Sequence, residues 1–93
     1  MASATNVMDL HGFAGTAILW KLQPPMDTRQ GETEYVITSA AVVRFTGPET
    51  YIFPATDSGE VTDWVELSGS YRGGFDHKEA LRRAGYDEFL FVQ

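Results

Sequence analysis

The chain has no cysteine among its 93 residues. It therefore forms no disulfide bond, offers no thiolate to a zinc ion and has no thiol nucleophile. It also lacks a long apolar run, because the longest, residues 17–20, is far shorter than the roughly 20 residues of a membrane-spanning helix. Residues 1–8 lack the basic start and apolar stretch of a signal peptide. We therefore expect no membrane partner and a cytoplasmic location.

Positive charge is scarce as well. Lysine and arginine together number 7 against 13 acidic residues, which gives a formal net charge of −6. Non-specific nucleic-acid binding needs basic residues that displace counterions from phosphates, so the composition argues against direct nucleic-acid binding. The same charge permits a partner that is itself basic.

The aromatic residues include 6 Phe, 4 Tyr and 2 Trp, and the apolar content suffices for one modest core. The spacing of apolar residues predicts an α+β fold, with an antiparallel sheet of about four to five strands and one short helix near the C-terminus. Residues 1–12 show no periodicity and are predicted to be a loose N-terminal lead-in, while residues 13–93 form the single domain. Strands are expected at residues 13–22, 34–45, 49–55, 60–67 and 88–92.

Proline and glycine mark the expected turns between these strands. Pro24 and Pro25 predict that the first strand stops there and that residues 23–33 form a connection. The Asp-Ser-Gly sequence at residues 57–59 predicts a hairpin between the third and fourth strands. Both faces of the first strand are apolar, which indicates a strand that is central or covered on both sides.

The expected helix begins after Asp76, whose side chain is suited to cap it. Glu79 follows at the spacing of a capping box, in which each of the two side chains accepts a backbone hydrogen bond. Gly85 suits the left-handed position after the last turn, and Tyr86 is then placed to pack on Leu81, as in a Schellman motif.

Sequence patterns for catalysis or cofactor binding are missing. The glycine-rich residues 69–74 precede the helix, but Asp76 and Glu79 would repel a phosphate at its start. His11 and His77 do not have metal-ligand spacing, so a solvated His77 is favoured over a metal ligand that pairs with Asp76 or Glu79. No serine lies in a nucleophile elbow. We therefore predict no enzymatic activity, no cofactor and no metal.

The acidic residues are concentrated in residues 49–66, which contain five acids and no lysine or arginine. A hairpin would gather these carboxylates on one surface, with Trp64 between Glu60 and Glu66. An acidic rim around an aromatic side chain suits a basic protein surface. The alternative is a solvated face that keeps the protein soluble, with Trp64 tucked under a loop. The predicted partner-binding residues are Glu49, Tyr51, Asp57, Glu60, Asp63, Trp64 and Glu66.

The motifs GPETYIFPA at residues 47–55, Asp63-Trp64, GSYRGG at residues 69–74 and residues 79–86 resemble small acidic proteins of phages and prophages. The resemblance covers the C-terminal half and leaves out residues 1–33. It implies a non-enzymatic inhibitor of host machinery, of the anti-CRISPR kind, that acts in the host cytoplasm. Its partner would be a basic host protein or ribonucleoprotein complex, such as a CRISPR effector.

A second hypothesis is a small structural or assembly protein that self-associates, as a homodimer or an extended sheet. Its contacts would form through the sheet edge near Pro54 or through the last expected strand, since unpaired strand edges readily pair with another chain.

Overall fold

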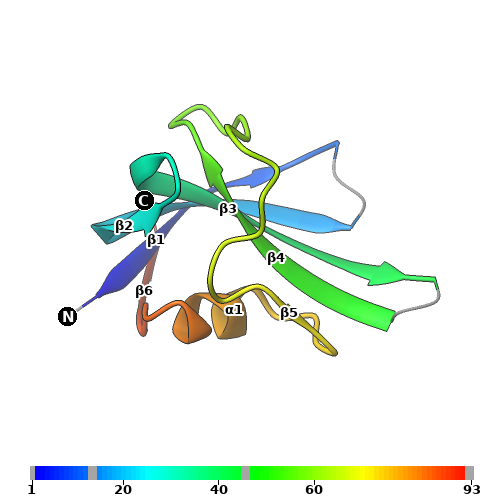
Figure 1. Cartoon of the computed structure of the whole chain (residues 1–93). Helices are drawn as coiled ribbons and strands as arrows, with labels where there is room; N and C mark the ends of the chain where they lie inside the picture. The colour runs from blue at the N-terminus through cyan, green and yellow to red at the C-terminus, as the bar shows by residue number, and fades with distance from the viewer. Residues whose placement is uncertain (1, 13–14, 45–46, 92–93) are drawn as a thin grey trace.

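A computed structural model of the protein describes residues 2–12, 15–44 and 47–91. A six-stranded sheet forms most of the fold, and one short helix packs against one of its faces (Figure 1). In chain order the elements are β1 (Ser3–Leu10), β2 (Thr16–Thr28), β3 (Gly31–Val43), β4 (Gly47–Ala55), β5 (Tyr71–Arg72), α1 (His77–Arg83) and β6 (Glu88–Phe91).

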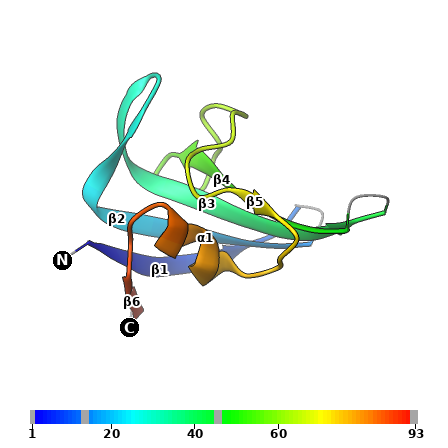
Figure 2. The same cartoon turned by 60° about the horizontal axis from the view of Figure 1, so that its bottom comes forward.

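The strand order across the sheet is β5-β4-β3-β2-β1-β6. Strands β1 to β5 pair with their neighbours in antiparallel fashion, whereas β6 pairs with β1 in parallel. The sheet is parallel there because the chain leaves β5, forms α1 and returns to the opposite edge (Figure 2). The prediction of a mostly sheet domain with one C-terminal helix is confirmed, but the prediction of four to five antiparallel strands is wrong.

The N-terminal segment is part of the sheet and not a loose lead-in. Strand β1 lies between β2 and β6, where Ala4 pairs with Leu22 on one side and Phe89 on the other. Ala4 is fully buried in the core. The small and polar residues of β1 carry little apolar periodicity, so its position depends on backbone pairing with two distant segments.

The predicted connection at residues 23–33 is also part of the sheet. Strand β2 continues through Pro24 and Pro25 to Thr28 and returns as β3 after a tight turn. The pairing register of β2 with β3 shifts between Lys21 and Met26, so both prolines lie in a bulge. A bulge tolerates proline because its residues do not all need to donate to the ladder.

The predicted strand at residues 60–67 does not form. Only one isolated bridge, between Ala55 and Val61, continues from the turn after β4. Pro54 accepts a 2.9 Å hydrogen bond from the Thr62 amide but has no N–H to return one, so the ladder stops. Farther along β4, the Ile52 amide donates a 2.8 Å hydrogen bond to the Ser70 hydroxyl and not to the backbone of another strand. The segment between β4 and β5 is therefore a long loop that crosses toward α1 (Figure 1).

Helix α1 has the predicted caps. The Asp76 carboxylate accepts hydrogen bonds from the amides of Lys78 and Glu79, at 3.0 and 3.2 Å. At the other end, the Tyr86 amide donates to the Leu81 carbonyl at 2.9 Å, which completes a Schellman motif around Gly85 at φ 103°.

The second half of the predicted capping box is wrong. The Asp76 amide donates to the Thr50 hydroxyl at 3.2 Å, while the Glu79 carboxylate accepts from Arg83 Nε at 3.0 Å. The helix start is thus fastened to β4 by Thr50, which is fully buried.

Each face of the sheet carries a cluster of buried apolar residues. On the helix side, Trp20 and Leu81 belong to the larger cluster of buried apolar residues. On the other side, Leu19 and Ile37 form a second cluster, against which Leu10 and Val61 pack. Since successive strand residues point to opposite faces, Trp20 belongs to the cluster on the helix side and Leu19 to the cluster on the other side. The expected strand at residues 13–22 was predicted to be central or covered on both sides, and β2 is indeed an interior strand with buried residues in both clusters.

Candidate functional site

The seven predicted partner-binding residues do not lie on one hairpin. Glu49 and Tyr51 belong to β4, and the other five lie in the loop between β4 and β5. Their environments differ sharply, because Glu49 is buried whereas Asp57, Glu60 and Trp64 are exposed. Their role in partner binding stays a prediction.

Glu49 is an internal charge and not a surface carboxylate. It is only 5% exposed, and its Oε1 lies 3.3 Å from Arg72 Nε on the neighbouring strand β5. The Tyr51 hydroxyl donates a short hydrogen bond to the other carboxylate oxygen of Glu49. This hydrogen bond raises the pKa of Tyr51 above its usual range. The trio holds β5 against β4 and is poorly placed to meet a partner.

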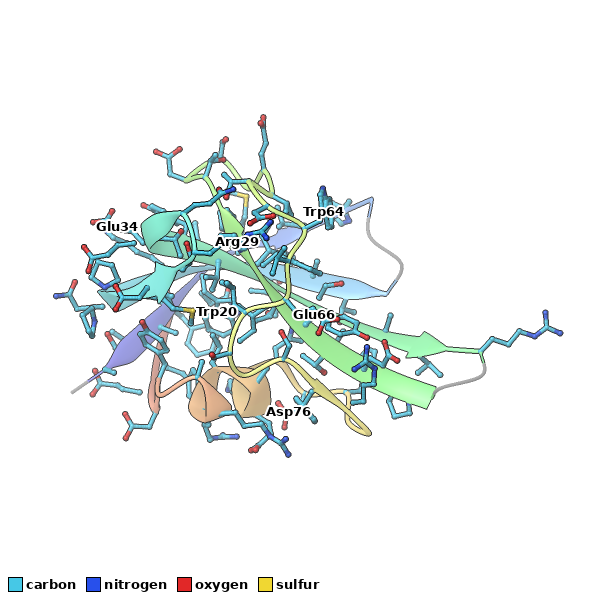
Figure 3. The ribbon with its side chains drawn as sticks, viewed as in Figure 1. Trp20, Arg29, Glu34, Trp64, Glu66 and Asp76 are labelled. Atoms are coloured by element: carbon cyan, nitrogen blue, oxygen red, sulfur yellow. The ribbon has the colours of Figure 1, made fainter. Side chains whose placement is uncertain are left out.

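Asp63 is also paired within the chain. Arg29, in the turn between β2 and β3, donates two hydrogen bonds to its carboxylate, from Nε at 2.8 Å and from Nη2 at 2.9 Å. This geometry is the two-pronged pairing that suits a guanidinium group and a carboxylate. The pair ties the long loop to the β2–β3 hairpin (Figure 3).

Trp64 lies on the surface and is not tucked under the loop. It is 68% exposed and extends outward from the loop, with its ring edge-on to Phe53 at a centroid distance of 5.2 Å (Figure 3). Phe53 in turn contacts Tyr51, at 6.1 Å between ring centroids. We call Tyr51, Phe53 and Trp64 the aromatic row. Glu66 lies near it and reaches Arg72 Nη2 at 3.7 Å.

Asp57 and Glu60 remain exposed, in the turn that follows β4. Asp57 lines an open groove of about 410 Å³ between this turn and the β2–β3 hairpin, together with Glu32 and Glu34. Tyr35, Pro54 and Ala55 also line the groove, and no lysine or arginine does so among the residues that the structure describes. We call this the acidic groove and define it by Glu32, Glu34 and Asp57.

Sequence reasoning missed the contribution of Glu32 and Glu34. The register of β3 against β4 places Tyr35 opposite Ala55, which brings residues 32–34 beside the turn at Asp57. That register follows from long-range pairing. The sequence shows two acids close together, Glu32 in the predicted connection and Glu34 at the start of the predicted strand, but it does not show that they lie beside Asp57.

His77 is partly buried, so the prediction of a solvated histidine is wrong. Its Nδ1 lies 2.6 Å from the Thr38 hydroxyl and its Nε2 lies 2.8 Å from the Thr16 hydroxyl. Burial lowers the pKa of His77 below its usual 6.5. Both ring nitrogens are therefore engaged in fastening α1 to β2 and β3.

Within residues 2–12, 15–44 and 47–91, no group of three or more His, Cys, Asp or Glu side chains could hold a metal ion. No helix in this part of the chain has the length and apolar character needed to cross a membrane. Comparisons with family models, with curated proteins and with solved structures return no match to the chain.

Proposed function

We propose that the protein is a non-enzymatic, phage-type inhibitor that binds a basic surface of a host protein or ribonucleoprotein complex in the host cytoplasm. The acidic groove would receive lysine and arginine side chains of the partner, and the exposed Trp64 would supply an apolar anchor. A surface that normally holds nucleic acid, such as that of a CRISPR effector, has the required charge.

One observation carries this proposal. Glu49 and Asp63 are paired within the chain, whereas Glu32, Glu34 and Asp57 line the open groove and are exposed. Arg29 and Arg72 are engaged by the first set, so they add no positive charge to the groove lining. Exposed carboxylates that face a groove without basic residues would steer a basic partner and repel an acidic one.

A charge-reversal pair tests the proposal. The variant Glu34→Lys/Asp57→Lys reverses two groove carboxylates, and the matched control Asp87→Lys/Glu88→Lys changes the net charge equally at exposed positions near β6. Each protein is titrated into purified CRISPR effector ribonucleoproteins bound to fluorescent target DNA, and DNA release is followed by anisotropy. We expect the unaltered chain and the control to release DNA, and the groove variant to need at least about tenfold more protein.

Equal potency of the groove variant and the control would refute the groove as the binding site. Failure of the unaltered chain to release DNA from any effector in the panel would refute this class of partner. Circular dichroism of each variant verifies that loss of inhibition does not reflect unfolding.

Self-association is the second candidate function, and it would use the edge of the sheet that β6 forms. Strand β6 ends the sheet, and its Leu90 and Phe91 are 44% and 63% exposed. Exposed apolar side chains on an edge strand favour pairing with another copy. Light scattering across a concentration series tests this, since a monomer at every concentration removes the hypothesis.

A further inference from the structure

Strand β1 is only partly covered by β6. The parallel pairs run from Ser3 with Glu88 to Asn6 with Phe91, and the pairing with β2 continues as far as Leu10. Among the residues that the structure describes, Met8, Asp9 and Leu10 pair with β2 and with no second strand, and Val7 lies at a register shift between Asn6 and Met8. Residues 7–10 thus have no described strand neighbour on the side where β6 pairs with residues 3–6 (Figure 2). Such an edge offers backbone N–H and C=O groups to an extended chain. Met8 in this segment is 42% exposed.

A groove runs beside this edge on the helix side of the sheet. It consists of two hollows, of about 230 and 420 Å³, that share Ile18 and His77 in their linings. Phe75, which is 47% exposed, lines the smaller hollow, and Asp9 lines the larger one. We call the two hollows together the β1 groove. Its wall is long enough and apolar enough to hold the stem of one extended side chain.

The charges around the β1 groove favour a basic side chain. Asp9 is exposed and close enough to His77 to interact with it electrostatically. Among the described residues, the only lysine or arginine in either lining is Lys78, whose Nζ lies over the rings of Phe89 and Phe91, at 5.8 and 5.6 Å from their centroids. Both nitrogens of His77 are occupied by threonine hydroxyls. Asp76, the other acid in the linings, accepts hydrogen bonds from the helix amides, so Asp9 is the acid that a side chain entering the larger hollow would meet.

We propose that residues 7–10 of β1 accept an extended segment of a basic partner as an added strand, with one lysine or arginine side chain lying in the β1 groove and pairing with Asp9. Main-chain hydrogen bonds would supply affinity, and the groove with Asp9 would select the side chain. A lysine or arginine fits because its stem is apolar and its head is charged. This site uses β1 and α1, so it does not depend on the acidic groove between the β2–β3 hairpin and the turn after β4.

Short synthetic peptides test the added strand. The probe is acetyl-Thr-Val-Lys-Val-Thr-amide, and the comparison peptide has glutamate in place of lysine. Both are titrated into the full chain while backbone amide signals are followed by NMR. We expect the lysine peptide to shift and protect the amides of residues 7–10, and the glutamate peptide to bind at least about tenfold more weakly, since like charges repel. A lysine peptide methylated on its backbone nitrogens should not bind.

A matched pair of variants locates the charge contact. Asp9→Asn should weaken binding of the lysine peptide by about fivefold, the upper range for an exposed ion pair. Glu88→Gln, an exposed acid on β6, should leave the affinity unchanged. Equal binding of both peptides, or shifts confined to residues 32–34 and 57, would overturn the proposal. So would protection of residues 7–10 that rises with protein concentration without peptide, because it would assign the edge to a second copy.

Discussion

The imidazole Nδ1 of His77 lies 2.6 Å from the hydroxyl of Thr38, which is fully buried. The same hydroxyl oxygen accepts a 2.8 Å hydrogen bond from the indole N–H of Trp20. In the neutral tautomer that carries its proton on Nε2, the Thr38 hydroxyl would donate to Nδ1 and Nε2–H would donate to Thr16. This chain of hydrogen bonds joins the start of α1 to β2 and β3.

Protonation of His77 should destabilise the fold. Burial is the largest influence on the pKa of His77 and lowers it below 6.5, and it outweighs the opposite effects of Asp76, of a hydrogen bond to the Thr38 backbone and of Asp9. In the unfolded chain the group takes up its proton near pH 6.5, before the folded protein does. The free energy of unfolding should therefore be greatest above about pH 6.5 and fall as the pH drops toward the folded-state pKa.

Urea unfolding measured from pH 7.5 to pH 5.5 tests this. The variant His77→Gln should lose the fall in stability over that range, whereas His11→Gln, which changes the other histidine, should keep it. The same slope in both variants would show that His77 does not cause the pH dependence.

The helix caps were predictable and much of the sheet was not, for a physical reason. Asp76 and Gly85 act on backbone groups within a few residues of themselves, so their local sequence carries the signal. The partners of Asp76 N–H and His77 lie in β2, β3 and β4, and no local pattern points to them. Strand β1 and the acidic groove likewise depend on pairing between distant segments, which a single sequence encodes weakly.

Glu49→Gln should lower the pKa of Tyr51 toward its usual value of 10.0, because the hydrogen bond to the Glu49 carboxylate is the main cause of the increase. The substituted amide would still fill the space but would carry no charge. Tyrosine ring signals followed by NMR against pH report each hydroxyl separately. Tyr86 is the internal control, since burial raises its pKa and the substitution leaves that burial intact. A Tyr51 titration that does not move would contradict the assigned hydrogen bond.

Gly69→Ala should destabilise the protein far more than Gly73→Ala. Both glycines have positive φ, 103° and 95°, so both substitutions carry the strain of a left-handed conformation, about 1–2 kcal/mol. A Cβ at Gly69 would also clash with the Ala80 carbonyl and come within 2.9 Å of Ala84 Cβ, whereas one at Gly73 meets open space. The added overpacking should cost about 1–3 kcal/mol more at Gly69.

Denaturant unfolding of both variants measures this difference directly. Equal destabilisation would mean that the loop before β5 does not pack against α1 as closely as the contacts at Gly69 require.

Trp64→Ala should weaken binding to the partner while it leaves the stability of the fold nearly unchanged. The side chain is 68% exposed and packs edge-on to Phe53, so its removal should change the free energy of unfolding by less than about 1 kcal/mol. If Trp64 is the anchor of the proposed interface, the same substitution should weaken inhibition of the partner about tenfold or more. Val42→Ala, at an apolar position on β3 that is 71% exposed, is the control and should affect neither property. Unchanged inhibition by Trp64→Ala would contradict the role of Trp64 as an anchor and would leave the acidic groove as the binding surface. A large loss of stability would instead show that Trp64 packs the loop on β4.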